Sequence, residues 1–161
     1  MEKEKKPQNG PSEAEKRARW REVYDAAVGE PLRWLQHDAA AHDDAALCEL
    51  RDVHGMAAFG RWWLLCEKLA GRKGHAYDVS APHGWARLAR DLEFEGGDGV
   101  AECEAFVAEL ARLDLINRTS FAEFRRVRNS RIDRTAEKAA EDAANGAMGP
   151  FVRDYVKGGP R

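Results

Sequence analysis

The sequence has few cysteines, and none are arranged in pairs. The three cysteines, Cys48, Cys66 and Cys103, are far apart and odd in number, and no Cys-x-x-Cys motif occurs. This pattern argues against a disulfide framework and against a zinc ribbon. Each cysteine has apolar neighbours at helical spacing, so we expect buried thiols in a reducing compartment.

Long apolar runs are also missing. No stretch approaches the roughly 18 to 20 residues that cross a bilayer, and the first residues, MEKEKK, lack the apolar core of a secretion signal. We therefore expect a cytoplasmic protein that has no membrane partner. The net charge is only −2, so any contact with nucleic acid must come from a local patch of positive charge.

Motifs of catalysis are absent as well. The chain contains no Gly-x-Ser-x-Gly elbow and no P-loop. A cluster of His37-Asp38 and His42-Asp43-Asp44 has ligand types that suit a metal. However, it lacks the distant first histidine and the further aspartate of an HD hydrolase, and capping and loop roles explain these aspartates. The sequence thus predicts a protein that is not an enzyme, with no cofactor and no metal.

The 161 residues, of which 43% are apolar, suffice for one domain with a tail. We expect residues 1–11 to be disordered and residues 12–30 to form an amphipathic helix, with Ser12 and Glu15 as its capping box. Residues 31–134 then form the domain. We assign residues 135–161 to a C-terminal helix and a flexible tail; the helical pattern itself begins at the end of the domain and covers about 133–144. For four apolar tail residues two roles stay open, packing on the protein's own domain or docking to a partner: Phe151, Val152, Tyr155 and Val156.

The first part of the domain predicts helices separated by short extended segments. Leu32 to Leu35 is an apolar segment that suits a strand. A helix beginning after Asp43 or Asp44 carries Leu47, Leu50 and Val53 and ends at Gly55. A second helix follows to Ala70, and residues 75–79 alternate as a short strand does.

The stretch from His83 to Ile116 predicts two helices joined by a turn. Trp85, Leu88 and Leu92 mark the first helix, and a glycine-rich turn covers residues 95–99. Phe106 and Leu110 lie on the apolar face of the second helix. Residues 113–116 and 119–127 suit the two strands of a wing. We therefore predict a mainly α fold with a small β-wing, a winged helix-turn-helix with an extra N-terminal helix. Its predicted core comprises Trp34, Leu50, Phe59, Trp63, Cys66, Leu88, Leu92, Phe106, Val107, Leu110 and Ile116.

Charge is segregated along this domain. Residues 91–109 contain seven acidic side chains and no basic one, whereas residues 117–134 contain six arginines against Glu123 and Asp133, a net charge of +4. A helix that reads DNA bases usually offers Arg, Lys, Asn or Gln, so the acidic second helix does not fit that role. Arginine suits bidentate contact with phosphate.

Two hypotheses follow. The first is mostly phosphate-directed binding of double-stranded DNA through six arginines: Arg118, Arg125, Arg126, Arg128, Arg131 and Arg134. The second is a protein-interaction module without DNA binding, which meets a basic partner or a second copy through five acidic residues: Glu95, Asp98, Glu102, Glu104 and Glu109.

A family resemblance rests on the order of several signals: Trp34 with His37-Asp38, then Asp43, the stretch from Gly55 to Trp63 (GMAAFGRWW), and Ser130-Arg131-Ile132 after the wing. From Leu32 to Arg134 the chain resembles the winged-helix N-terminal domain of replication proteins of phages and mobile elements, of the replisome-organiser and DnaD-like kind. The resemblance implies DNA binding and a role in replication initiation or its regulation, with self-association or a replisome protein as partner.

Overall fold

The computed structural model describes residues 10–35 and 39–158 of the chain. The chain forms two compact units. The central unit comprises residues 30–135, and the terminal unit comprises residues 1–29 and 136–161. Residues 1–9, most of the stretch predicted to be disordered, lie outside the described residues, as do residues 36–38 and 159–161.

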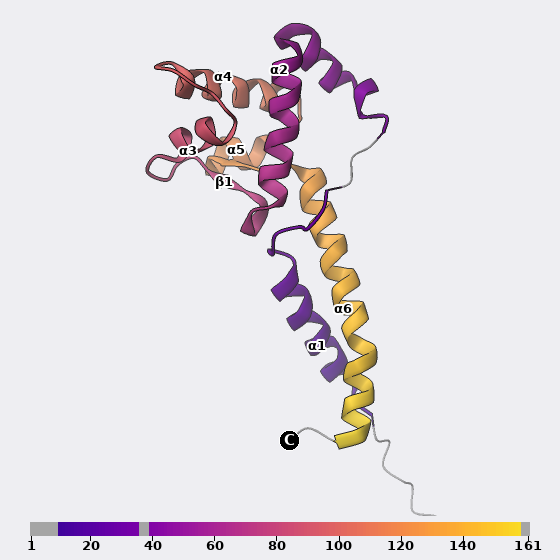
Figure 1. The fold of residues 1–161 in the computed structure, drawn as a ribbon. Helices are drawn as coiled ribbons and strands as arrows, with labels where there is room; N and C mark the ends of the chain where they lie inside the picture. Colours follow the sequence, from indigo (N-terminus) through magenta and orange to yellow (C-terminus); the bar gives the residue numbers. More distant parts are fainter. Residues whose placement is uncertain (1–9, 36–38, 159–161) are drawn as a thin grey trace, which may run out of the picture. The chain divides into compact units, whose positions relative to one another are not determined.

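The central unit is mainly helical and holds a small antiparallel sheet of two short strands, as the sequence predicts. In Figure 1, α3, α4, α5 and β1 lie to one side of α2. Tyr77 pairs with Val127, and Asp78 with Arg126. The elements in order are η1 (Ala41–Asp43), α2 (Ala45–Ala70), η2 (Lys73–His75), β1 (Tyr77–Asp78), α3 (Gly84–Asp91), α4 (Gly99–Arg112), α5 (Arg118–Phe124), β2 (Arg126–Val127) and the start of α6 (Ser130–Gly158).

Helix α2 joins the two helices expected between Asp44 and Ala70. The Asp44 side chain accepts hydrogen bonds from the backbone of Ala46 and Leu47, which fixes its beginning. Gly55, with φ 80° and ψ 176°, interrupts the helical geometry at the predicted boundary. Only glycine adopts this conformation readily. Val53, expected on the apolar face, is 65% exposed.

The core of the central unit confirms most of the expected residues. Those that are buried are Leu50, Cys66, Leu88, Leu92, Phe106, Val107, Leu110 and Ile116. Phe59 and Trp63 are only partly buried against this core, and Trp62 is buried instead. For Trp34 the prediction is wrong, because its side chain is 69% exposed.

The segment around Trp34 is not a strand. The Leu32 N–H donates to the carbonyl of Ala70 at 2.8 Å, and Leu32 and Leu35 pack against the core. These two side chains secure the segment in an irregular conformation, and Trp34 is left in solvent.

The wing predicted over residues 113–116 and 119–127 is mostly wrong. After α4 the chain turns tightly, with Asp114 at φ 61° and the Leu115 N–H bonded to the Leu110 carbonyl at 2.9 Å. The Asn117 side chain then accepts a bond from the Ser120 N–H and begins α5. Of the expected return strand, only β2 is extended.

In the terminal unit, α1 (Glu13–Ala27) has the predicted capping box between Ser12 and Glu15. The prediction of an unstructured tail is wrong over residues 145–158, which continue α6 despite Pro150. Two long-range bonds tie this part of α6 to α1. Trp20 Nε1 donates to Asn145 Oδ1 at 2.8 Å, and the Tyr155 hydroxyl donates to Glu15 at 3.0 Å.

The apolar residues of this tail differ in exposure. Phe151, Val152 and Tyr155 are half-buried, while Val156 is exposed.

The three cysteines are free thiols. Cys66 and Cys103 are buried as expected, and burial raises the pKa of each to about 12. Cys48 is half-buried, and its Sγ donates to the carbonyl of His42 at 3.1 Å.

Candidate nucleic-acid interface

Two of the six predicted arginines are engaged within the protein. Arg118 donates from Nε to the Ala111 carbonyl at 2.7 Å and from Nη2 to the Arg112 carbonyl at 2.6 Å. It also pairs with Asp114 at 3.1 Å, so it satisfies the carboxyl end of α4.

Arg128 is engaged in a different way. Its Nη2 lies 2.9 Å from a carboxylate oxygen of Asp133, and both side chains are largely covered. Arg118 and Arg128 therefore have structural contacts that compete with any contact to phosphate.

Arg125 lies at the junction of α5 and β2 and is held by its backbone. It ends α5 in the left-handed conformation, with φ 51°. Its N–H donates to the Phe121 carbonyl at 3.1 Å, and its own carbonyl accepts from the Val79 N–H at 3.0 Å. Its guanidinium carbon lies 5.1 Å from the ring centre of Phe121 and 5.7 Å from that of Trp85. These distances suit cation–π contact, which orients the guanidinium without neutralising its charge.

Arg126 follows on β2, opposite Asp78. Because successive strand residues face opposite sides, the burial of Val127 directs Arg126 outward, and Arg126 is exposed. Within the described parts of the chain, neither Arg125 nor Arg126 has a carboxylate within ion-pair distance of 4.0 Å. Two adjacent guanidinium groups that form no ion pair with a described residue thus lie at the end of the β1–β2 ladder.

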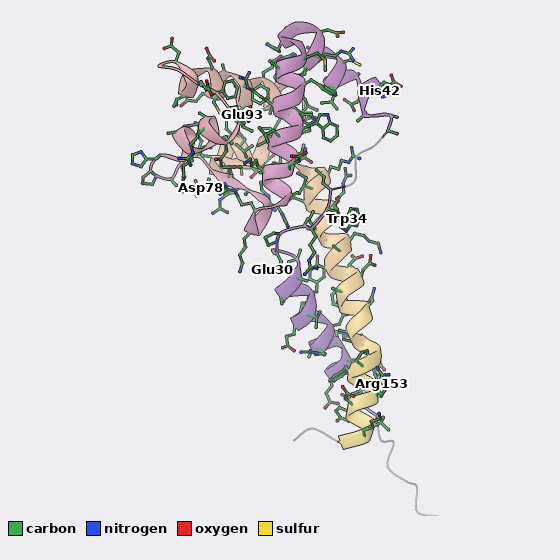
Figure 2. All side chains as sticks on the ribbon, in the orientation of Figure 1. Glu30, Trp34, His42, Asp78, Glu93 and Arg153 are labelled. Carbon is green, nitrogen blue, oxygen red and sulfur yellow. The ribbon has the colours of Figure 1, made fainter. Side chains whose placement is uncertain are left out.

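The loop beside this arginine pair is fixed by local bonds. Asp78, labelled in Figure 2 at the end of β1, accepts from the Ser80 hydroxyl and from the backbone of Ser80 and Ala81. The Ser80 hydroxyl bond is the main cause that holds the pKa of Asp78 below its ordinary value, and the charge of Arg126 contributes. Gly84 lets α3 begin against β1, because a Cβ there would lie 2.6 Å from the Asp78 carbonyl oxygen.

Arg131 and Arg134 form a second group in the first turns of α6. They line a cavity of about 280 Å³, together with Trp62, Trp63 and residues of both charge signs. Asn129 accepts bonds from the N–H groups of Arg131 and Ile132 at 2.8 and 3.1 Å, which satisfies this end of α6.

The acidic residues of the stretch 91–109 also fall into two groups, those with a partner inside the protein and those without an ion pair among the described residues. Asp91 accepts from the Tyr77 hydroxyl at 2.6 Å, and Glu109 lies 2.7 Å from Arg112 and 3.1 Å from His54. The Arg112 hydrogen bond is the main cause that lowers the pKa of Glu109 to about 2. Of the five residues predicted to bind a partner, Glu109 is therefore neutralised by neighbours.

The other four remain exposed, and in the described residues no basic group lies within 4.0 Å of their carboxylates: Glu95, Asp98, Glu102 and Glu104. Glu93, labelled in Figure 2 between α3 and α4, has the same exposure. We call these five exposed carboxylates the acidic face. Their negative charge would repel phosphate.

Three aromatic residues near Arg125 were not among the predicted site residues. Trp85 and Phe121 contact each other edge-to-face at 6.2 Å, and Phe124, one turn after Phe121, is 62% exposed. The signal in the sequence was the helical spacing of the two phenylalanines after the Asn117 cap, which the expected strand concealed.

Comparison with known proteins adds no relative: no family model, no curated protein and no solved structure matches the chain. Among the residues that the structure describes, no helix is both long and apolar enough to span a membrane.

Within residues 10–35 and 39–158, no group of three or more His, Cys, Asp or Glu is placed to hold a metal ion. His37 and Asp38 lie outside the described residues, so two of the five residues of the cluster considered from the sequence are not placed.

Proposed function

We propose that this chain is a non-enzymatic DNA-associated protein whose central unit is a winged helix-turn-helix, acting in replication initiation or its regulation in a phage or mobile element. The order of α2, β1, α3 and α4 and the pairing of β1 with a strand after α4 support this architecture. In this arrangement α5 occupies the place of the first wing strand. The resemblance in sequence supports the role in replication.

The observation that carries the proposal is the adjacent pair Arg125 and Arg126. Both are exposed, both follow α5 at the end of the ladder, and neither is neutralised by a carboxylate in the described residues. Guanidinium groups bind phosphate oxygens through directed pairs of hydrogen bonds. The contact therefore positions the protein on the DNA backbone and carries little sequence information.

The acidic face makes docking of DNA against α4 unfavourable. If α4 entered the major groove, Glu102 and Glu104 would lie among phosphates and weaken binding by like-charge repulsion. We therefore place the DNA at the end of the β1–β2 ladder, with α4 away from the groove.

A double variant tests the proposal. Arg125→Ala with Arg126→Ala removes two positive charges, and the matched control Arg17→Ala with Arg21→Ala removes two from α1, where both arginines are exposed. We expect weaker binding of a fluorescent duplex by the first variant only, measured by anisotropy at about 50 mM salt, where phosphate contacts contribute most. Equal affinity of both variants for the duplex would contradict the proposal.

The uncompensated acidic residues favour a second candidate function, a protein-interaction module. Glu95, Asp98, Glu102 and Glu104 would then meet a basic surface of a second copy or of a replisome protein. Under this candidate, Glu102→Lys with Glu104→Lys dissociates an assembly that light scattering detects in the unmodified protein. Glu137→Lys with Glu141→Lys, on exposed positions of α6, is the control. A monomer before and after both changes argues against self-association.

A further inference from the structure

We infer that the end of the β1–β2 ladder binds DNA that offers an unpaired base, and that Phe124 is the residue on which this base stacks. This inference rests on the proposed function and deepens it, because it names the form of DNA that gains a contact with Phe124 beside the phosphate contacts of the arginine pair. The ligand class is a single strand, or the single-stranded part of a fork or bubble.

Phe124 is free to contact a ligand. Its side chain is 62% exposed, although the residue is the last of α5 and only Arg125 separates it from β2. The nearby Phe121 has the opposite role, since it packs against the core and against Trp85. The local core is therefore filled without Phe124, and its ring remains available on the surface.

The position of Phe124 is fixed by its neighbours. The chain after it is tied to β1 through the bond from the Val79 N–H to the Arg125 carbonyl and through the pairing of Asp78 with Arg126. The positive φ of Arg125 ends the helix at this point. Because the backbone is held in this way, only the side-chain torsions of Phe124 must be ordered when a base stacks on its ring.

The two arginines that follow supply the contacts a nucleotide needs. Consecutive Cα atoms are about 3.8 Å apart, so Phe124, Arg125 and Arg126 lie within reach of one base and its flanking phosphates. Aromatic rings that hold bases beside guanidinium groups that follow the backbone are the usual means of binding single strands.

Closed duplex offers its phosphates to the arginine pair but no unpaired base to Phe124. The faces of its bases are stacked on one another, so a ring reaches them only if a base step is opened, which costs several kcal/mol. A single strand also presents one line of phosphates, which the arginine pair can follow while the acidic face of α4 stays clear.

The test compares a fluorescent single-stranded oligothymidine with a duplex of the same length, by anisotropy, for the full chain. We expect Phe124→Ala to weaken binding of the single strand by about 5-fold to 100-fold and to leave duplex binding unchanged. Phe124→Trp should keep the affinity, since it retains a flat ring. Trp34→Ala, at another exposed aromatic residue, is the matched control and should change neither.

A second readout does not depend on affinity. Photocrosslinking with an oligonucleotide that carries 5-iodouracil should place the crosslink on Phe124, as mass spectrometry of the digested protein would show.

The failures are distinguishable. If Phe124→Ala binds the single strand normally, or loses affinity for both forms of DNA equally, while Arg125→Ala with Arg126→Ala weakens binding, the stacking role is wrong and the DNA proposal stands. If the unmodified protein binds neither form at about 50 mM salt, the proposed function itself is wrong.

Discussion

Arg118 shows that a residue in a basic segment can serve the fold. Its guanidinium donates to two carbonyls at the carboxyl end of α4 and pairs with Asp114. Such carbonyls have no partner within the helix, and a cation there also interacts favourably with the helix dipole.

We expect Arg118→Ala to lower the free energy of unfolding by about 1 kcal/mol, with DNA affinity reduced less than by Arg126→Ala. Urea denaturation followed by circular dichroism measures the change. The control is Arg134→Ala, which removes an arginine that has no hydrogen bond or ion pair from its side chain to described residues. It should stay within about 0.5 kcal/mol of the unmodified protein. Equal stability of the two variants would show that Arg118 does not support α4.

Glu109 makes stability depend on pH. Its folded-state pKa, about 2, lies below the ordinary value of 4.5 because Arg112 and His54 bind the charged form. The stabilisation is therefore complete above about pH 4.5 and is lost as the pH falls toward about 2. The Glu109→Gln variant has no carboxylate at this position, so this contribution to the pH dependence is absent from it.

We therefore expect the unmodified protein to be more stable than Glu109→Gln at about pH 5 and the difference to shrink below about pH 4.5. Urea midpoints measured across this range test it. A difference that persists unchanged down to about pH 3 would contradict the assignment of the low pKa to Glu109.

At the scale of elements, α2 contains two glycines whose backbone conformations differ. Gly55 has φ 80° and ψ 176°, whereas Gly60 lies in regular helix, and a Cβ on either would meet open space. Any difference between the two substitutions therefore reports backbone conformation and not a steric clash.

We expect Gly55→Ala to lower the free energy of unfolding by roughly 1 to 3 kcal/mol and Gly60→Ala to raise it by roughly 0.5 to 1 kcal/mol. Thermal unfolding of both variants measures this. If Gly55→Ala is as stable as Gly60→Ala, residues 45–70 form one uninterrupted helix.

Elements with strong local signals were predictable from sequence. The capping box of α1, the boundary at Gly55 and the two helices around the glycine-rich turn follow from caps, breakers and helical periodicity. The wing was mispredicted because residues 118–124 are short and partly apolar, and their pattern fits a strand as well as a helix. The Asn117 cap selects the helix over the strand, and it is a single side-chain hydrogen bond that the apolar pattern does not reveal.

The prediction of an unstructured tail over residues 145–158 was wrong for a different reason. Gly146, Gly149 and Pro150 each disfavour helix locally, so composition predicts an irregular chain. The bonds from Trp20 to Asn145 and from Tyr155 to Glu15 join residues more than a hundred positions apart, and no local pattern announces them. For the same reason the sequence did not separate Arg118 and Arg128, which pair with carboxylates inside the protein, from Arg125 and Arg126, which have no carboxylate within 4.0 Å among the described residues.

For the whole molecule, the separation of charge matters more than its total. The chain carries a net charge of −2, yet the end of the β1–β2 ladder presents two exposed arginines and the outward side of α4 two exposed glutamates, none of which forms an ion pair within the described parts of the chain. Fields of this kind act over roughly 10 Å at about 0.1 M salt and fade as salt rises. DNA should therefore meet the arginine pair and avoid α4.

The measurement that tests this account most directly is the salt dependence of binding to a fluorescent duplex, from about 50 to about 200 mM salt. Each arginine–phosphate contact contributes about 0.9 to the slope of log K against log salt. We predict that Arg125→Ala with Arg126→Ala reduces the magnitude of the slope by about 1.8, while Arg17→Ala with Arg21→Ala leaves it unchanged. An identical slope for the unmodified protein and both variants would contradict the claim that the arginine pair contacts phosphate.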